Sequence, residues 1–360
     1  GIHSDYYFLD LNDSIYRPNT GEFETLHGYT GTLPVLQPYV AYQYRPLPNL
    51  TFNVGVHSQY VGINNEIMIE PRFGVGYSLT EKDRVSFGYG LHSQIQPLEL
   101  YFNEKNEGGV VSTPNSSLKM TKSNHFILGY QHWFNYGIKV KLEGYYQRLY
   151  DVPVSPDSTN FSILNFGADF TTALPDEMVN DGTGENYGAE LTIEKSLRKG
   201  MYFLITTSIY ESFFTSFSGE KFNTAFNGNF TFNALAGYEW RFKVKPGKKF
   251  QNSMTFDGKF MLNGGKRFTP ILIEESMFFG AEIRDVDQTF TSKYPNYIRG
   301  DFRIGFKMVG KRITNEWALD IQNITGYRNI FLQEFDPILG EMKTTYQTGR
   351  LPIFQYRLYF

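Results

Sequence analysis

The last ten residues of the chain read Leu351-Pro-Ile-Phe-Gln-Tyr-Arg-Leu-Tyr-Phe360. From Phe354 onward, apolar or aromatic side chains alternate with Gln355, Arg357 and Tyr359. A period of two is typical of a β-strand whose two faces meet different environments. Water-soluble domains usually fray into polar residues at their termini, whereas a barrel needs a closing strand that leaves no open edge. The stretch therefore predicts a last strand, either of a soluble sandwich or of a membrane barrel.

The same alternation recurs along the whole chain. Residues 84–92 and 298–307, for example, place apolar side chains at every second position and small, polar or charged ones between them. About fourteen such segments are present, many of them long enough for a tilted strand that crosses a membrane. We therefore predict an all-β fold, a transmembrane antiparallel β-barrel.

The connections between these segments are short and long in turn, which favours a barrel over a sandwich. Short turns on one rim and long loops on the other are typical of outer-membrane barrels. The predicted turns are residues 45–49, 80–84, 135–137, 197–200, 245–249 and 310–312. The predicted loops are residues 11–34, 60–66, 102–123, 151–186, 211–229, 270–295 and 333–347.

Composition narrows the class further. The chain has 360 residues, 26 Tyr, 33 Phe and no Cys, and a formal net charge of −3. Disulfides and thiolate metal sites are thereby excluded, and no basic run is long enough to follow a nucleic-acid backbone. No apolar run reaches the length of a membrane-spanning helix. The first residues carry no secretory signal, so we expect that it has been removed or that the chain is part of a longer protein.

One face of the predicted sheet carries many charges, which are too costly to bury unpaired in a dry core. In a soluble protein this face would meet solvent, and in a barrel it would line the lumen. We expect Glu–Arg pairs such as Glu70 with Arg84 to face inward, as well as Glu239 and Arg241 with Asp257 and Lys259. The residues predicted to face the lumen and to contact a plug or a ligand are His57, His92, Arg72, Arg84, Glu143, Asp257, Lys259, Arg299, Asp301 and Arg303.

No catalytic or metal-binding pattern stands out. The six histidines do not show a zinc-ligand spacing with a third ligand. The Gly-x-Gly runs follow strand alternation and open no helix, and no nucleophile elbow is present. We therefore predict neither an enzyme, nor a cofactor, nor a metal site.

Several stretches together resemble a known family. They are residues 48–60, 69–77, 85–94, 263–271, 319–325 and the closing residues 349–360. Their order and spacing resemble the C-terminal barrel of TonB-dependent outer-membrane receptors, in the form common in Bacteroidetes. That family has a plugged barrel of about 22 strands. Its TonB-binding motif and plug are not recognisable in this sequence, so residues 1–360 are expected to be the C-terminal part of such a barrel, without plug and N-terminal strands.

The resemblance implies a function and partners. It implies TonB-energised uptake of a scarce ligand, such as a siderophore, haem, glycan or peptide, in the outer membrane of a Gram-negative bacterium. The implied partners are outer-membrane lipid, the plug with the N-terminal strands, and TonB through the plug, and a surface lipoprotein is allowed. A passive porin-like channel and a soluble β-rich binding protein remain as alternatives. The resemblance also implies that Phe354, Tyr356, Leu358 and Phe360 form a C-terminal assembly signal.

Overall fold

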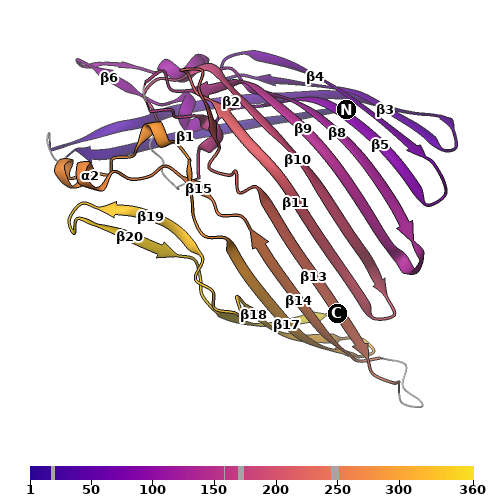
Figure 1. Ribbon diagram of the computed structural model, residues 1–360. Helices are drawn as coiled ribbons and strands as arrows, with labels where there is room; N and C mark the ends of the chain where they lie inside the picture. The colour runs from indigo at the N-terminus through magenta and orange to yellow at the C-terminus, as the bar shows by residue number, and fades with distance from the viewer. Residues whose placement is uncertain (18–20, 158, 169–173, 245–250) are drawn as a thin grey trace.

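The computed structural model describes residues 1–360 except 18–20, 158, 169–173 and 245–250. Fourteen long strands, the wall strands, form one antiparallel sheet in which each pairs with the next wall strand along the chain (Figure 1). They are β1 (Ile2–Arg17), β2 (Glu22–Leu47), β3 (Leu50–Val61), β4 (Glu66–Ser78), β5 (Asp83–Gln94), β8 (Thr121–Phe134), β9 (Ile138–Val154), β10 (Val179–Arg198), β11 (Met201–Thr215), β13 (Phe230–Arg241), β14 (Ser253–Asn263), β17 (Tyr297–Val309), β18 (Thr314–Gln322) and β21 (Leu351–Tyr359). The predicted number of strands and their antiparallel order are thus confirmed.

The remaining elements are short and lie in the connections. A fifteenth strand of the sheet, β12 (Lys221–Asn223), pairs with β11, and three small hairpins are separate from the wall. The hairpins are β6 (Lys105–Glu107) with β7 (Val110–Ser112), β15 (Arg267–Phe268) with β16 (Ser292–Lys293), and β19 (Ile330–Asp336) with β20 (Glu341–Tyr346). The helices are α1 (Leu98–Tyr101), α2 (Ile273–Phe279) and the 3₁₀ turns η1 (Pro114–Ser117), η2 (Asn135–Gly137), η3 (Ile163–Asn165) and η4 (Val286–Gln288). Neither α-helix within the described ranges is long and apolar enough to cross a membrane.

The two ends of the sheet differ as predicted. Among the described residues, tight turns, one of them η2, join the wall strands at one end. The short paired strands and the other helices gather at the other end, which we call the loop end (Figure 1). The predicted turn over residues 245–249 lies outside the described residues. The predicted loop over residues 11–34 is wrong, because β1 and β2 stay paired from Ile2 to Arg17. The predicted loop over residues 151–186 is also too long, since β9 continues to Val154 and β10 begins at Val179.

A reversal of polarity explains why the first hairpin looked like a loop. Near the loop end, Leu9 and Leu11 of β1 pack against buried residues of a neighbouring segment. Asp10, between them, points to the opposite side and accepts a hydrogen bond from the Thr30 hydroxyl at 3.1 Å. The face that is polar in the rest of the wall is therefore apolar here, which hides the pattern in the sequence.

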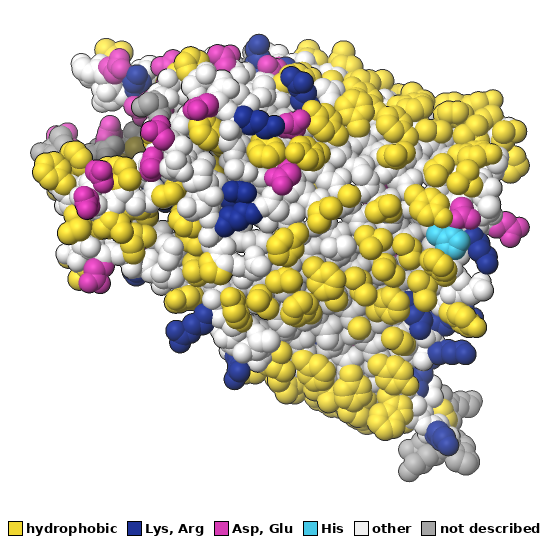
Figure 2. All heavy atoms as spheres, in the orientation of Figure 1, with side chains coloured by type: hydrophobic (Ala, Val, Ile, Leu, Met, Phe, Trp, Pro, Cys, Tyr) yellow, Lys and Arg dark blue, Asp and Glu magenta, His cyan; other side chains and the backbone are white. Residues whose placement is uncertain are grey.

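The sheet has one polar and one apolar face, because residues opposite each other in the register point to the same side. On the apolar face, Phe87 is 38% exposed, Phe302 39% and Phe354 69%. Hydrophobic side chains cover much of the strand region in Figure 2, whereas charged side chains gather towards the two ends. A soluble sandwich would bury Phe87 and Phe302 under a second layer. This exposure disfavours the soluble alternative and suits a wall in contact with lipid.

Candidate functional site

The ten side chains predicted to line the lumen all lie on the polar face. Facing pairs in the register link them from strand to strand: His57 lies opposite Glu70, and Arg303 lies opposite both Asp257 and Asp320. The register places on this face His57, Arg72, Arg84, His92, Glu143, Asp257, Lys259, Arg299, Asp301 and Arg303. Their contact with a plug or a ligand stays a prediction.

Glu70 on β4 is a nearly buried carboxylate, 2% exposed. Its Oε2 lies 2.8 Å from His57 Nδ1 and accepts a hydrogen bond from Arg72 Nη2 at 3.0 Å. Its Oε1 accepts hydrogen bonds from the backbone N–H of Ser93 at 2.7 Å and from the Ser93 hydroxyl at 2.6 Å. A buried carboxylate is tolerable when both oxygens are hydrogen-bonded. Glu70 therefore fastens β3, β4 and β5 together.

The predicted pair of Glu70 with Arg84 is wrong. Arg84 lies opposite Ser78 near the turn end, eight residues along β4 from Glu70, roughly 26 Å at the rise of a strand. Its guanidinium lies over Gly76, where an added Cβ would require this flexible side chain to shift. Sequence alternation gave the correct face for both residues, but it could not give the stagger between the strands.

His92 packs against a histidine of the next strand. The ring centroids of His92 and His125 are 4.6 Å apart across β5 and β8. Both residues lie on the polar face, on the same strands as Arg84 and its register partner Gln131. The polar face therefore carries a pair of imidazole rings across β5 and β8, at the other end of β5 from Arg84.

A second cluster ties the last three wall strands together. Arg303 on β17 donates to Glu316 and Asp320 of β18, at 3.1 and 3.4 Å, and to Gln355 of β21 at 3.2 Å. Tyr359 of β21 also donates its hydroxyl to Glu316, at 3.0 Å. One cation therefore links three strands and faces two carboxylates.

The neighbouring charges of β14 and β17 are paired locally. Arg299 Nε donates to Asp301 at 2.7 Å, and Lys259 lies opposite Asp301 in the register. Asp257 accepts a hydrogen bond from the Tyr202 hydroxyl, which reaches it across β13. The predicted pairing of Glu239 and Arg241 with Asp257 and Lys259 is not formed: the register places Thr255 and Ser253 opposite them, and Glu239 pairs with Arg241 of its own strand at 2.8 Å.

Pairs of oppositely charged side chains also occur in the middle of the wall, on β9 and β10. Glu143 accepts from Lys141 at 2.6 Å on β9, and Lys139 pairs with Glu194 of β10 at 2.6 Å. These side chains are partly exposed, so each pair adds only about 0–1 kcal/mol to stability. What the pairs supply is a hydrated, charged surface along the polar face.

Residues 95–120, the inserted loop, cover the polar face near the loop end. Leu100, Tyr101 and Leu118 of this loop are buried against Leu9 and Leu11 of β1. Burial raises the pKa of the Tyr101 hydroxyl to about 12. The loop therefore lies over the polar side of the wall instead of extending away from it.

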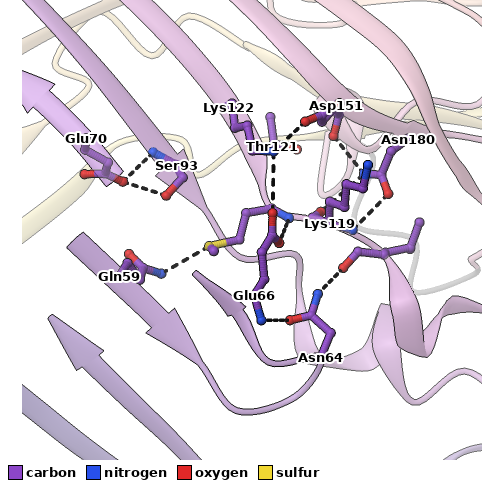
Figure 3. A network of polar contacts seen from close by, with 12 residues as sticks. Gln59, Asn64, Glu66, Glu70, Ser93, Lys119, Thr121, Lys122, Asp151 and Asn180 are labelled. Atoms are coloured by element: carbon purple, nitrogen blue, oxygen red, sulfur yellow. Dashed lines mark hydrogen bonds and ion pairs between the residues drawn. The ribbon is translucent and has the colours of Figure 1, made fainter. Parts of the chain in front are cut away.

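Polar contacts fasten the inserted loop to β3 and β4 (Figure 3). Asn64 Nδ2 donates to the carbonyl of Leu118 at 2.7 Å, and Glu66 Oε2 accepts from the N–H of Met120 at 2.6 Å. Gln59 Nε2 approaches Met120 Sδ at 3.6 Å. Because these contacts satisfy backbone groups of the loop, they fix its path.

A second set of contacts fastens the same loop to β9 and β10 (Figure 3). Asn180 accepts from the N–H of Lys119 at 2.9 Å and donates to its carbonyl at 3.2 Å. Just past the end of the loop, Lys122 of β8 pairs with Asp151 at 2.6 Å and with Glu66 at 3.5 Å. The loop is thus held on one side by residues 59–66 and on the other by Asn180 of β10.

On the apolar face, aromatic rings form a continuous row near the turn end. Successive ring centroids from Trp240 through Phe242, Phe306 and Trp317 to Tyr356 are 5.7, 6.3, 6.0 and 5.7 Å apart. Aromatic residues are enriched where a membrane barrel meets the membrane–water interface. The row includes Tyr356 of the closing stretch, where the alternation predicts an apolar or aromatic side chain.

Sequence reasoning missed the polar residues that hold the charges in place. Ser93, Tyr202 and Gln355 are the main examples, and none carries a distinctive motif. Only strand pairing brings them to Glu70, Asp257 and Arg303. Across the described residues, no group of His, Asp and Glu could hold a metal ion.

A single antiparallel sheet with an apolar outer face, a charged inner face and an aromatic row defines the wall of a transmembrane β-barrel. A sequence model of the family described as "TonB dependent receptor-like, beta-barrel" matches residues 2–324. The chain belongs to this family, as its sequence patterns had indicated.

Solved structures show the same fold. The outer membrane transporter YddB from Escherichia coli is similar with a TM-score of 0.61 and 14% identity, covering 98% of this chain and 48% of YddB. The ferric-catecholate import receptor Fiu from E. coli matches with a TM-score of 0.60 and 10% identity, over 90% of this chain and 44% of Fiu. The ferric yersiniabactin uptake receptor FyuA from Yersinia pestis matches with a TM-score of 0.59 and 13% identity, over 91% and 46%.

The chain thus spans less than half the length of these structures. No curated protein matches its sequence. These solved structures show that the chain shares the fold of part of such barrels.

Proposed function

We propose that the chain forms part of the wall of an outer-membrane receptor that takes up a scarce ligand with energy from TonB. The observation that carries the proposal is the division of the sheet into an apolar face and a charged face, in a member of the TonB-dependent receptor family. The apolar face would contact outer-membrane lipid. The charged face would contact a plug domain, through residues such as Arg72, Asp257 and Arg303.

The open edges of the sheet support a larger barrel. Among the described strands, β1 pairs only with β2, and β21 only with β18. Unpaired edges are not tolerated in lipid. We therefore infer that further strands, as in a barrel of about 22, complete the wall and enclose the plug.

The ligand is proposed from the class of relatives. Fiu and FyuA are described as a ferric-catecholate import receptor and a ferric yersiniabactin uptake receptor. An iron-bearing siderophore is therefore the first ligand to test, before haem, glycans and peptides. The loop end would receive it, and the inserted loop would narrow its path.

A comparison of uptake tests this function. A strain without the gene and a strain without TonB are each given radiolabelled iron on a panel of siderophores. Loss of uptake of the same siderophore in both strains supports the proposal. Uptake that persists without TonB, with ion conductance of the purified protein in planar bilayers, would instead show the passive channel.

The last strand is proposed to carry the assembly signal. Phe354, Tyr356 and Leu358 lie on the apolar face and are exposed, and Phe360 follows β21. Replacing Phe360 by Ala should reduce the amount of folded protein in the outer-membrane fraction, while Arg357→Gln, on the polar face of the same strand, should not. Equal amounts of folded protein in both variants would show that the terminal aromatic residue has no such role.

A further inference from the structure

The apolar face of the wall has a hollow of about 680 Å³ over its middle strands, β8 to β11. Its floor lies at Gly144 of β9 and Ala189 of β10, which are opposite each other in the register. An added Cβ at Gly144 would meet no heavy atom within 4 Å, so this glycine leaves open space on the apolar side of the sheet. We call this space the wall hollow, and its volume lies within the usual range of small-molecule sites.

Large apolar side chains border the wall hollow on both sides of its floor. Leu128 of β8 lies opposite Gly144 and is 65% exposed, and Ile209 of β11 lies opposite Ala189 and is 64% exposed. Neighbouring strands are about 4.8 Å apart, so three strand spacings, roughly 14 Å, separate Leu128 from Ile209. The wall hollow is therefore a groove with a floor of small residues between two projecting apolar ridges.

A row of aromatic side chains borders the wall hollow on the side of the loop end. Tyr89, Phe126, Tyr146 and Tyr187 face one another in the register across β5, β8, β9 and β10. The Tyr146 hydroxyl donates to Glu185 at 3.1 Å, and Glu185 lies two residues beyond Tyr187 towards the loop end. Aromatic rows of this kind occur where a membrane barrel meets the membrane–water interface. The wall hollow therefore lies within the apolar band, beside the interface nearer the loop end.

Charged side chains follow on the far side of this aromatic row. Arg148 lies opposite Glu185, and Lys221 donates to Glu185 at 2.5 Å. Glu211 lines the edge of the wall hollow, and the charge of Lys293 interacts with it. In this group three cations accompany two carboxylates, so one positive charge remains. A phosphate group suits such a surplus, because cations bind phosphate oxygens through charge-assisted hydrogen bonds.

The lining of the wall hollow itself suits a hydrocarbon chain. Apart from tyrosine hydroxyls, its polar side chains are Glu211 and Asn229, both near the loop end. Water in an apolar hollow beside lipid would find few hydrogen-bond partners. Arg148 is four residues from Gly144 along β9, about 13 Å at the rise of a strand. A lipid whose headgroup lies at Arg148 can therefore place its acyl chain over Gly144.

We propose that the wall hollow binds one acyl chain of a phosphate-bearing lipid of the outer leaflet, whose headgroup contacts Arg148 and Lys221. The proposal rests on the proposed function only because that function has the apolar face in contact with lipid. It adds a defined lipid site and the two cations that recognise the headgroup.

Native mass spectrometry of the full-length protein in detergent micelles tests the site. The probes are phosphatidylglycerol, which is anionic, and phosphatidylcholine, which has no net charge, both with the same palmitoyl and oleoyl chains. Gly144→Leu fills the floor of the wall hollow. Gly258→Leu on β14 is the matched control, because Gly258 lies opposite Phe302 on the same face and an added Cβ there also meets no heavy atom within 4 Å.

We expect the wild type and the Gly258→Leu variant to retain one phosphatidylglycerol equally. Gly144→Leu should weaken both lipids by about tenfold, because the exclusion of roughly two methylene groups from the wall hollow suffices for that change. If Gly144→Leu fails to give the folded barrel, Leu128→Ala, which lowers one ridge, should also weaken both lipids.

The headgroup contact has its own variant. Arg148→Gln should weaken phosphatidylglycerol by about fivefold and leave phosphatidylcholine unchanged, since one cation near a lipid surface contributes about that much. Lys105→Gln removes a cation from β6 of the inserted loop and should change neither lipid.

Three results would overturn the proposal. The wild type could retain neither lipid, or Gly144→Leu could retain both as tightly as the wild type does. An equal effect of Arg148→Gln on the two lipids would show that no headgroup phosphate is held there. The comparison of uptake with and without TonB measures transport in cells and not lipid retention, so the two proposals fail separately.

Discussion

Glu70 and His57 face each other across β4 and β3, with Oε2 and Nδ1 2.8 Å apart on the polar side of the wall. Glu70 also accepts from Arg72 and twice from Ser93. The carboxylate therefore links three strands, and its removal should lower the stability of the sheet.

We predict that Glu70→Gln destabilises the protein by about 1–3 kcal/mol, because an amide cannot accept from all of these donors. The measurement is guanidinium unfolding in detergent micelles, followed by tryptophan fluorescence. Glu81→Gln, in the exposed turn before β5, is the control and should be close to neutral. Equal unfolding midpoints for the Glu70→Gln and Glu81→Gln variants would contradict the role given to Glu70.

A new positive charge should lower the stability of the barrel when it is placed on the apolar face and should have little effect on the polar face. Ala234 and Asn233 are neighbours on β13 and point to the apolar and the polar face. Ala234→Arg should destabilise the barrel in lipid vesicles by about 2–4 kcal/mol, since arginine near the bilayer midplane is costly. Asn233→Arg should change stability little. Similar losses in both would show that the apolar face does not meet lipid.

Arg303 should hold β21 against the sheet. Replacing it with Met leaves Glu316 and Asp320, four residues apart on β18, without their shared cation. A loss of about 3 kcal/mol is expected, at the lower end of the cost of breaking a buried pair, because these side chains are partly exposed. Hydrogen exchange should rise first in residues 351–359. Arg357→Met, on the same face, should leave exchange in that strand nearly unchanged.

Lys122 of β8, two residues past the inserted loop, should limit the mobility of that loop. Lys122→Met removes its contacts with Asp151 and Glu66. We expect faster hydrogen exchange in residues 95–120, by roughly fivefold for about 1 kcal/mol. Lys82→Met, in a turn at the other end, is the control. An unchanged exchange rate would mean that Asn64, Gln59 and Asn180 suffice to hold the loop.

The candidate site was predictable in part. Alternation assigned the face of all ten charged or imidazole residues, because a strand sends successive side chains to opposite sides. It could not assign partners: Glu70 meets His57 and Ser93, not Arg84, since partners depend on the stagger between strands. It also failed at residues 11–34, where the inserted loop covers Leu9 and Leu11 and reverses the usual polarity.

The sequence by itself determined the all-β class, the number of wall strands and most of the alternation of turns and loops. These depend on local periodicity and on turn residues, which can be read without knowledge of distant contacts. Only the tertiary structure decided which charges pair, how residues 95–120 lie over the polar face, and how Gly144 meets Ala189 at the floor of the wall hollow. Those features join segments tens of residues apart, and hydrogen-bond geometry at such distances leaves no period in the sequence.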